Sequence, residues 1–229
     1  MARLTGVLYL ITILGGVFAQ AFVADRMIDF SNAGTTASNI LANETLYRLG
    51  FTVFLIEMTA QIMTSVLFYY LLKPVSRSGS LMAAVLGLTG CIIKTFARVL
   101  FLAPLWVLHH GPALAGYSPD QVNSLALAML RVNDEGAAVA VAFFGPSTFL
   151  LGWLMIKSTF FPRWLGILGV VGGILWTSFY WPSFGRSLFM VSAVVGLVGS
   201  LATIGWLIVV GLDEQRWREQ VDASRASIW

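Results

Sequence analysis

The sequence predicts an all-α integral membrane protein, a bundle of six transmembrane helices with both termini in the cytoplasm. Of its 229 residues, 58% are hydrophobic and only 11% are charged, whereas about 25% of the residues in a soluble domain are charged. The mean hydropathy is +0.82. So few charges cannot cover the apolar surface of a soluble fold. Because backbone groups cannot stay unpaired in lipid, the apolar segments are predicted to be helices rather than open strands.

Six apolar segments approach or exceed the length of about 20 residues that a helix needs to cross a hydrocarbon core of about 30 Å. In chain order they lie at 4–24, 49–72, 81–108, 136–156, 164–181 and 188–212. We expect 1–212 to form the six-helix transmembrane domain. The charged segment 213–229 is expected to be a short cytoplasmic tail in the form of a solvated helix.

The fourth segment has a long approach on its N-terminal side. A single helix over 120–156 would be about 55 Å long, which exceeds the thickness of the membrane. We therefore expect 119–132 to lie along the outer interface or to pack inside the bundle. Ser118 as a cap and Pro119 in the first turn are typical of a helix start. The stretch 35–47 is predicted to form a short outer helix.

Lysine and arginine in the short connections predict the orientation of the bundle. If six helices alternate, five basic residues fall on one side, which is predicted to be cytoplasmic: Arg3, Lys73, Arg77, Lys157 and Arg163. Arg186 is the exception, because it lies in the outer turn between the last two segments. The first segment also resembles a signal peptide with a small-residue cleavage site. Cleavage would leave five helices, and the loop charges do not decide between the two outcomes.

Several classes of site and partner are not predicted. Cys91 is the only cysteine, which excludes an internal disulfide and a thiolate metal cluster. His109 and His110 are adjacent and have no third histidine beside them, so no metal site and no cofactor is expected. There is no basic run that would predict a nucleic acid partner. The chain contains no sequence motif of a nucleotide-binding or hydrolytic enzyme, and the oligomeric state is left open.

The informative residues are the ionisable ones inside the predicted spans. Placing a charge at the centre of a bilayer costs about 2.5–3.5 kcal/mol even on the insertion scale, so these residues are expected to face the bundle interior and to pair. Helical spacing puts several of them on shared faces. The candidate site residues are Glu57 and Gln61 on the second segment, Lys94 and Arg98 on the third, and Arg131, Asp134 and Glu135 at the start of the fourth.

The depths of these residues agree. Glu57 and Arg98 each lie about ten residues from the outer end of their segments, on sequential antiparallel helices. We therefore predict that they pair or share a polar cavity in the outer half of the membrane. The three positive charges balance the three negative ones.

Three functions are compatible with such a cluster. The first is binding or transport of a small polar or amphiphilic ligand that enters from the outer face. The second is a lipid-modifying membrane enzyme that uses Glu57 or Glu135 as an acid or base. The third is a regulatory or scaffold subunit whose buried ion pairs lock helices together. The expected partners are the lipid bilayer and a small-molecule or lipid ligand.

Short segments along the chain carry a family resemblance. They are ARLTGVLYL at 2–10, NILA at 39–42, YRLGF at 47–51, LLKPV at 71–75 and FPRWLG at 161–166. Together they resemble the bacterial multi-pass membrane proteins of domain-of-unknown-function family 4386, over nearly the whole chain. The resemblance implies a bacterial inner-membrane location and a six-helix domain. It also argues against signal cleavage, because it includes the first segment, and it implies no catalytic residues.

Overall fold

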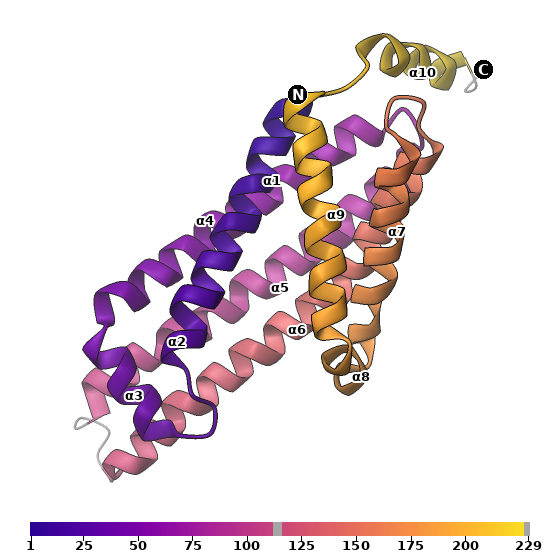
Figure 1. The fold of residues 1–229 in the computed structure, drawn as a ribbon. Coiled ribbons are helices and arrows are strands. Elements are labelled where there is room, and N and C mark those ends of the chain that lie inside the picture. The colour runs from indigo at the N-terminus through magenta and orange to yellow at the C-terminus, as the bar shows by residue number, and fades with distance from the viewer. Residues whose placement is uncertain (112–115, 227–229) are drawn as a thin grey trace. The chain divides into compact units, whose positions relative to one another are not determined.

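The computed structural model describes residues 1–111 and 116–226, and over these residues it consists of helices and connecting turns without a strand (Figure 1). Part of the predicted outer loop 109–119 and the end of the predicted tail 213–229 therefore lie outside the described residues. Five helices are long and apolar enough to cross a membrane: Ala2–Met27, Glu44–Leu72, Arg77–His110, Pro119–Lys157 and Phe189–Val209. These five helices are typical of a membrane protein.

The first of these five is not uniform along its length. It consists of α1 (Ala2–Val17), the π-helix η1 (Phe18–Ala24) and one last turn, α2 (Asp25–Met27). The other four are α4 (Glu44–Leu72), α5 (Arg77–His110), α6 (Pro119–Lys157) and α9 (Phe189–Val209). Pro104 and Pro146 lie inside α5 and α6 without ending them.

The predicted fifth segment forms a shorter helix. α7 (Arg163–Thr177) has 15 residues, which corresponds to about 22 Å and is less than the hydrocarbon thickness. The 3-10 turn η3 (Ser178–Tyr180) and the short helix α8 (Pro182–Ser187) follow it. The sixth transmembrane helix therefore stays a prediction.

Side chains at two helix starts explain where those helices begin. α3 (Ala33–Ala42) covers only the first part of the outer helix predicted at 35–47, because the residues from Glu44 on belong to α4. At its start, the Asn32 side chain accepts a hydrogen bond of 3.0 Å from the Thr35 amide. At α6, the Ser118 hydroxyl accepts from the Gln121 amide, and the Gln121 side chain accepts from the Ser118 amide at 2.8 Å. This reciprocal arrangement is a capping box, and it confirms the predicted start of α6.

The chain divides into two compact units. Unit 1 comprises Met1–Ile11, Ala60–Cys91 and Ala138–Trp229, and unit 2 comprises Thr12–Thr59 and Ile92–Ala137. In unit 1, a hydrophobic cluster of buried side chains includes Phe68, Leu72, Leu154, Leu165 and Leu207.

Glycines allow the helices of unit 1 to pack closely. A Cβ added at Gly173 of α7 would lie 2.3 Å from the backbone nitrogen of Phe149 in α6, and one at Gly152 would lie 2.5 Å from the nitrogen of Val170. These distances place the backbones of α6 and α7 in direct contact, as small residues do between membrane helices. α7 and α9 lie side by side (Figure 1).

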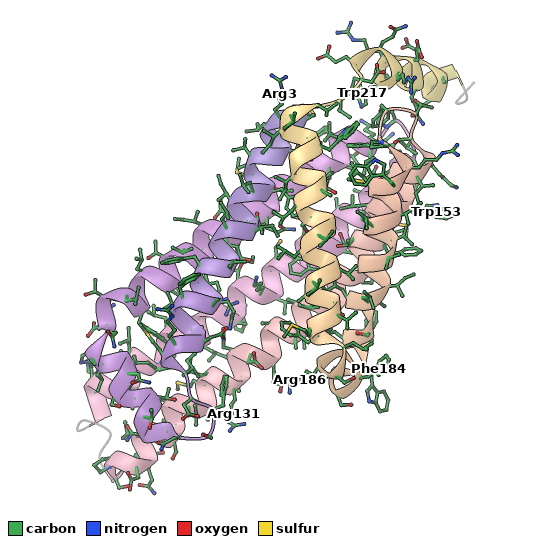
Figure 2. The ribbon with its side chains drawn as sticks, viewed as in Figure 1. Arg3, Arg131, Trp153, Phe184, Arg186 and Trp217 are labelled. Atoms are coloured by element: carbon green, nitrogen blue, oxygen red, sulfur yellow. The ribbon has the colours of Figure 1, made fainter. Side chains whose placement is uncertain are left out.

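The last helix of unit 1, α10 (Glu214–Ala226), is polar. Hydrogen bonds made by two of its side chains attach it to the rest of unit 1. Trp217, labelled in Figure 2, donates a hydrogen bond of 3.0 Å from its indole nitrogen to the Leu71 carbonyl. The Gln220 side chain accepts from the amide of Thr159 at 3.1 Å. α10 is thus held by side-chain contacts against the end of α4 and against the connection that follows α6.

Unit 2 has an aromatic core. Tyr47, Phe54 and Phe101 are fully buried together with Ile40 and Leu130. The Tyr47 hydroxyl donates to the Phe101 carbonyl. Because Leu130 belongs to this core, the first half of α6 packs inside unit 2, which is the second of the two alternatives expected for 119–132.

Candidate ligand-binding site

The first element of the site is a buried ion pair between α4 and α5. Lys94 Nζ lies 2.6 Å from Glu57 Oε1, and the two side chains are 19% and 5% exposed. A Cβ added at Gly16 of α1 would lie only 3.1 Å from the same Glu57 oxygen. The absence of a side chain at Gly16 therefore lets the helix backbone cover this carboxylate.

Arg98 lies one turn further along α5 and is 3% exposed. Its Nη1 donates a hydrogen bond of 3.1 Å to Asn133 Oδ1 of α6. Its guanidinium carbon lies 3.7 Å from the centre of the Phe54 ring. Stacking on an aromatic ring suits the planar, weakly hydrated guanidinium group, which explains how unit 2 holds this charge in an apolar core.

The aromatic core of unit 2 holds the Phe54 ring on which Arg98 stacks. Phe54 packs edge to face against Phe101 with ring centroids 5.3 Å apart, and Phe101 stacks on Tyr47 at 4.5 Å. The Tyr47 hydroxyl is satisfied by the Phe101 carbonyl. Arg98 thus lies at the end of a series of packed aromatic side chains from α4 and α5.

Arg98 and Asn133 line a cavity of about 160 Å³ within unit 2. The lining residues come from η1, α2, the following loop, α5 and α6: Gln20, Ala24, Asp25, Ile28, Phe30, Arg98, Asn133, Asp134 and Ala137. The cavity thus contains one guanidinium, two carboxylates and two amides on an otherwise apolar wall. π-helical segments such as η1 occur frequently at functional sites.

The loop after α2 forms one wall and is fixed by hydrogen bonds. Arg131 Nη2 donates to the Phe30 carbonyl at 2.6 Å; Figure 2 labels this arginine. The backbone amide and hydroxyl of Ser31 donate to Asp29 Oδ1 at 2.8 and 2.6 Å. These bonds from Ser31 lower the pKa of Asp29 below its ordinary value, because they stabilise the charged carboxylate.

The mouth of the cavity also has an internal hydrogen bond. Gln20 Nε2 donates to Asp25 Oδ1 at 2.7 Å, and this contact is exposed. Asp134 is exposed as well, whereas Arg98 and Asn133 are buried. The cavity therefore has a buried wall with hydrogen-bond donors and an exposed, acidic rim.

Several buried polar atoms of unit 2 have no hydrogen-bond partner. Among the described residues these are Glu57 Oε2, Thr95 Oγ1 and Arg98 Nε. Most buried polar groups in proteins are paired, so each exception needs an explanation. Arg98 Nε is the informative one, because Arg98 is the only residue of the three that lines the cavity.

The structure brings together some of the predicted site residues. Glu57, Lys94 and Arg98 lie in unit 2, and Asp134 lines the cavity. Arg131 supports the wall from outside through Phe30. Glu135 is exposed and is not part of the lining, and Gln61 belongs to unit 1.

Glu57 and Arg98 were predicted to pair or to share a polar cavity, and the structure shows neither arrangement: the two side chains have other partners, and only Arg98 lines the cavity. Glu57 pairs with Lys94, and Arg98 bonds Asn133 instead. The lysine and the arginine share one face of α5, so depth alone could not decide which of them reaches the carboxylate. The guanidinium stacks on Phe54, and Lys94 takes the position beside Glu57.

Sequence reasoning missed Asn133 and Asp25 and left the role of Gln20 open. Asn133 lies between Arg131 and Asp134 and is a polar amide in the same charged stretch, which was a usable signal. Gln20 and Asp25 come together because of the helical turns at the end of the first span, and the sequence carries no comparable signal for that contact.

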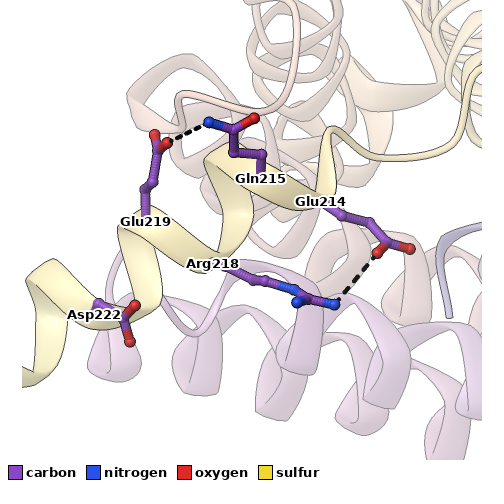
Figure 3. Close-up of a pocket in the computed structure, with 5 residues that line it drawn as sticks. All are labelled: Glu214, Gln215, Arg218, Glu219 and Asp222. Carbon is purple, nitrogen blue, oxygen red and sulfur yellow. Dashed lines mark hydrogen bonds and ion pairs between the residues drawn. The ribbon is translucent and has the colours of Figure 1, made fainter.

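A second, shallower hollow lies on α10 and is not a candidate ligand-binding site. Figure 3 shows that its five lining residues all come from this one helix. Gln215 bonds Glu219 at 3.1 Å, and Arg218 lies 3.6 Å from Glu214. Because these side chains only bridge successive turns of an exposed helix, nothing encloses a ligand there.

Comparisons with known proteins address the family rather than the ligand. Neither the comparison with curated proteins nor the comparison with solved structures gives a match. The family model described as "Domain of unknown function (DUF4386)" matches residues 4–211, which is nearly the whole chain and includes every residue of the cavity. The chain belongs to the DUF4386 family.

Proposed function

We propose that this protein binds or transports a small polar or amphiphilic ligand in the cavity of unit 2. The observation that carries the proposal is Arg98. This side chain is 3% exposed, lines the cavity and has a donor, Nε, without a partner.

The energetic argument concerns the unmet donor. Leaving a buried donor unsatisfied costs about 1–3 kcal/mol, and more when the group is charged. The surrounding apolar residues could have formed a packed core instead, which is usually at least as stable as a buried charge. A ligand with an oxygen acceptor at Arg98 removes this cost, and charged residues within membrane segments commonly mark ligand or ion pathways.

The regulatory or scaffold function is the second candidate, and a separate observation favours it. The Glu57–Lys94 pair is covered at Gly16 and neither residue lines the cavity, so this pair suits a purely structural role. The enzyme alternative lacks comparable support, because neither Glu57 nor Glu135 lines the cavity where a substrate would be held.

A variant that fills the cavity without touching a charge tests the binding function. Ala137 lines the cavity, whereas Ala128 is an exposed residue of α6 in the same unit. We expect native mass spectrometry of the purified wild-type protein and of Ala128→Leu to show a bound small molecule or lipid. Ala137→Leu should lose that species while keeping its melting temperature. Equal retention in both variants would contradict the proposal.

We further propose that six helices cross the bacterial inner membrane and that both termini are cytoplasmic. The family membership and the five basic residues near the predicted inner ends support this topology. In this topology, α7 with η3 and α8 forms the remaining crossing between α6 and α9.

Reporter fusions test this topology. Alkaline phosphatase fused after Gly116 should be active, and fused after Gly79 it should be inactive, because the enzyme folds only outside the cytoplasm. Activity in the reverse pattern would show that the orientation is inverted.

A further inference from the structure

The two ends of the unit 2 cavity differ in charge and in exposure. The buried wall presents Arg98 and Asn133, which are 3% and 7% exposed. The rim presents the carboxylates of Asp25 and Asp134, both of which are exposed. A molecule that fills the cavity therefore meets a positive, donor-rich end and a negative end.

The buried end suits an anionic oxygen group. Arg98 Nη1 is already occupied by Asn133 Oδ1, and this bond together with the stacking on Phe54 fixes the guanidinium plane. Nε is the donor without a partner. Asn133 also carries an amide nitrogen with two N–H donors. Carboxylate and phosphate oxygens are the groups that arginine binds best.

The rim suits an ammonium group. Asp25 lies at the rim, and its side-chain hydrogen bond comes from the neutral amide of Gln20, so a simple anion would meet the negative charge of this carboxylate. A simple cation would leave the Arg98 donor unsatisfied. A ligand that carries both charges satisfies both ends.

We propose that the ligand is a compact zwitterion, with a phosphate or carboxylate at Arg98 and an ammonium group at the rim beside Asp25. This inference rests on the proposed binding function and names its ligand class. The cavity volume of about 160 Å³ is below the range of about 300–1,000 Å³ typical of drug-sized ligands. The zwitterion is therefore a small solute or the headgroup of a zwitterionic lipid, which share this chemistry.

Isothermal titration calorimetry of the detergent-purified protein tests the charge requirement. The probes are O-phosphoethanolamine, which has both groups, methyl phosphate, which lacks the ammonium, and ethanolamine, which lacks the phosphate. We expect O-phosphoethanolamine to bind at least about tenfold more tightly than ethanolamine, since hydrogen bonds to charged groups are the stronger ones.

A rim variant then isolates the ammonium contact. Asp25→Asn should weaken O-phosphoethanolamine about twofold to fivefold, which is the range for an exposed charge pair. The same variant should leave methyl phosphate binding unchanged or tighter, because a repelling carboxylate is gone. Asp120→Asn is the matched control, because Asp120 is an exposed acid of α6 in unit 2 that does not line the cavity; it should change neither affinity.

A lipid arm distinguishes the two sources. Nanodiscs are prepared with phosphatidylethanolamine or with phosphatidylglycerol, which has no ammonium group, and bound lipid is counted by native mass spectrometry. Retention of phosphatidylethanolamine that Ala137→Leu abolishes assigns the site to a headgroup. Binding of soluble O-phosphoethanolamine without lipid retention assigns it to a free solute.

The failures are separable. If methyl phosphate and O-phosphoethanolamine bind equally, are both lost in Ala137→Leu and are both insensitive to Asp25→Asn, the zwitterion is overturned while ligand binding stands. If no probe or lipid binds but Ala137→Leu still loses the species that co-purifies with the wild type, the zwitterion is also overturned while ligand binding stands. If Ala137→Leu keeps that species as well, the binding function itself fails.

Discussion

Units 1 and 2 bury different kinds of polar side chain. Among the described residues of unit 1, the buried polar side chains are all serine or threonine: Thr5, Thr64, Ser65, Ser80, Ser147, Ser158, Ser192 and Thr203. Unit 2 buries two threonines, Thr12 and Thr36, and in addition Glu57, Arg98 and Asn133. Of these two sets, only the second includes charged groups.

The difference lies in how each kind of group is satisfied. Of the eight buried serine and threonine hydroxyls of unit 1, all except that of Ser147 donate to a carbonyl three or four residues earlier in the chain. Such bonds need no neighbouring helix, so the helices can pack by shape alone. Charged side chains need partners from other helices, and in unit 2 some of their atoms remain without one. Unit 1 also contains a buried atom without a partner, Trp206 Nε1, but this group is neutral. The feature that separates the candidate site from a packed core is therefore a charged side chain, Arg98, that lines a cavity and has one donor without a partner.

The largest loss of stability is expected from breaking the buried ion pair between Glu57 and Lys94 in unit 2. Lys94→Met leaves the Glu57 carboxylate without its cation, which should cost about 3–5 kcal/mol unless the carboxylate takes up a proton. Adding Glu57→Gln should recover much of the loss, since the two residues are in contact. Melting curves in detergent measure both steps. Additive losses would show that the pair does not form.

A smaller effect is expected from the close packing of unit 1. Gly173→Ala places a Cβ 2.3 Å from the Phe149 nitrogen, and we expect a loss of about 1–3 kcal/mol from overpacking. Gly205→Ala is the control in α9, where an added Cβ meets nothing within 4 Å. Equal melting temperatures for these two variants would contradict the packing of α6 against α7.

Removing a buried hydroxyl of unit 1 should destabilise the protein less than Gly173→Ala does. The Ser147 hydroxyl donates a hydrogen bond of 2.7 Å to the Ala83 carbonyl on another helix. Ser147→Ala should therefore lower the free energy of unfolding by about 0.6 kcal/mol, the average for such bonds between membrane helices. Ser192 donates to its own helix, and Ser192→Ala should cost less. A larger loss at Ser192 would show that local satisfaction does not explain unit 1.

The loop that lines the cavity has a pH dependence of known sign. The lowered pKa of Asp29 means that its carboxylate contributes to loop order above the ordinary value of 3.8, and that this contribution is lost as the pH falls through the lowered value. Ser31→Ala should move the pKa back up. Titration of the Asp29 carboxyl carbon by NMR checks this shift, and an unchanged pKa would exclude the Ser31 hydroxyl as its main cause.

The smallest loss of stability is expected from removing an exposed charge on α10. Arg218 and Glu214 are 75% and 82% exposed, and exposed ion pairs contribute little to stability. Arg218→Gln should leave the melting temperature unchanged within error. A clear decrease would mean that α10 contributes more to unit 1 than its exposed charges suggest.

The sequence by itself determined the class of protein and the approximate positions of its long apolar helices. The apolar segments predicted at 4–24, 49–72, 81–108, 136–156 and 188–212 correspond to the five candidate spans, because apolar length is a local property. The cap of α6 at Ser118 was also visible, because a cap acts within one turn, although the reciprocal bond from the Gln121 side chain was not predicted. The cost of a charge in lipid likewise marked Glu57, Lys94 and Arg98 without any structure.

Only the tertiary structure decided which of these charges meet. Lys94 rather than Arg98 reaches Glu57, because the choice depends on side-chain reach and on the Phe54 ring that holds the guanidinium. The cavity likewise depends on a π-helical turn and on a loop fixed by Arg131 and Asp29. These features arise from contacts between residues up to 101 positions apart, and the spacing of residues along one helix does not contain them.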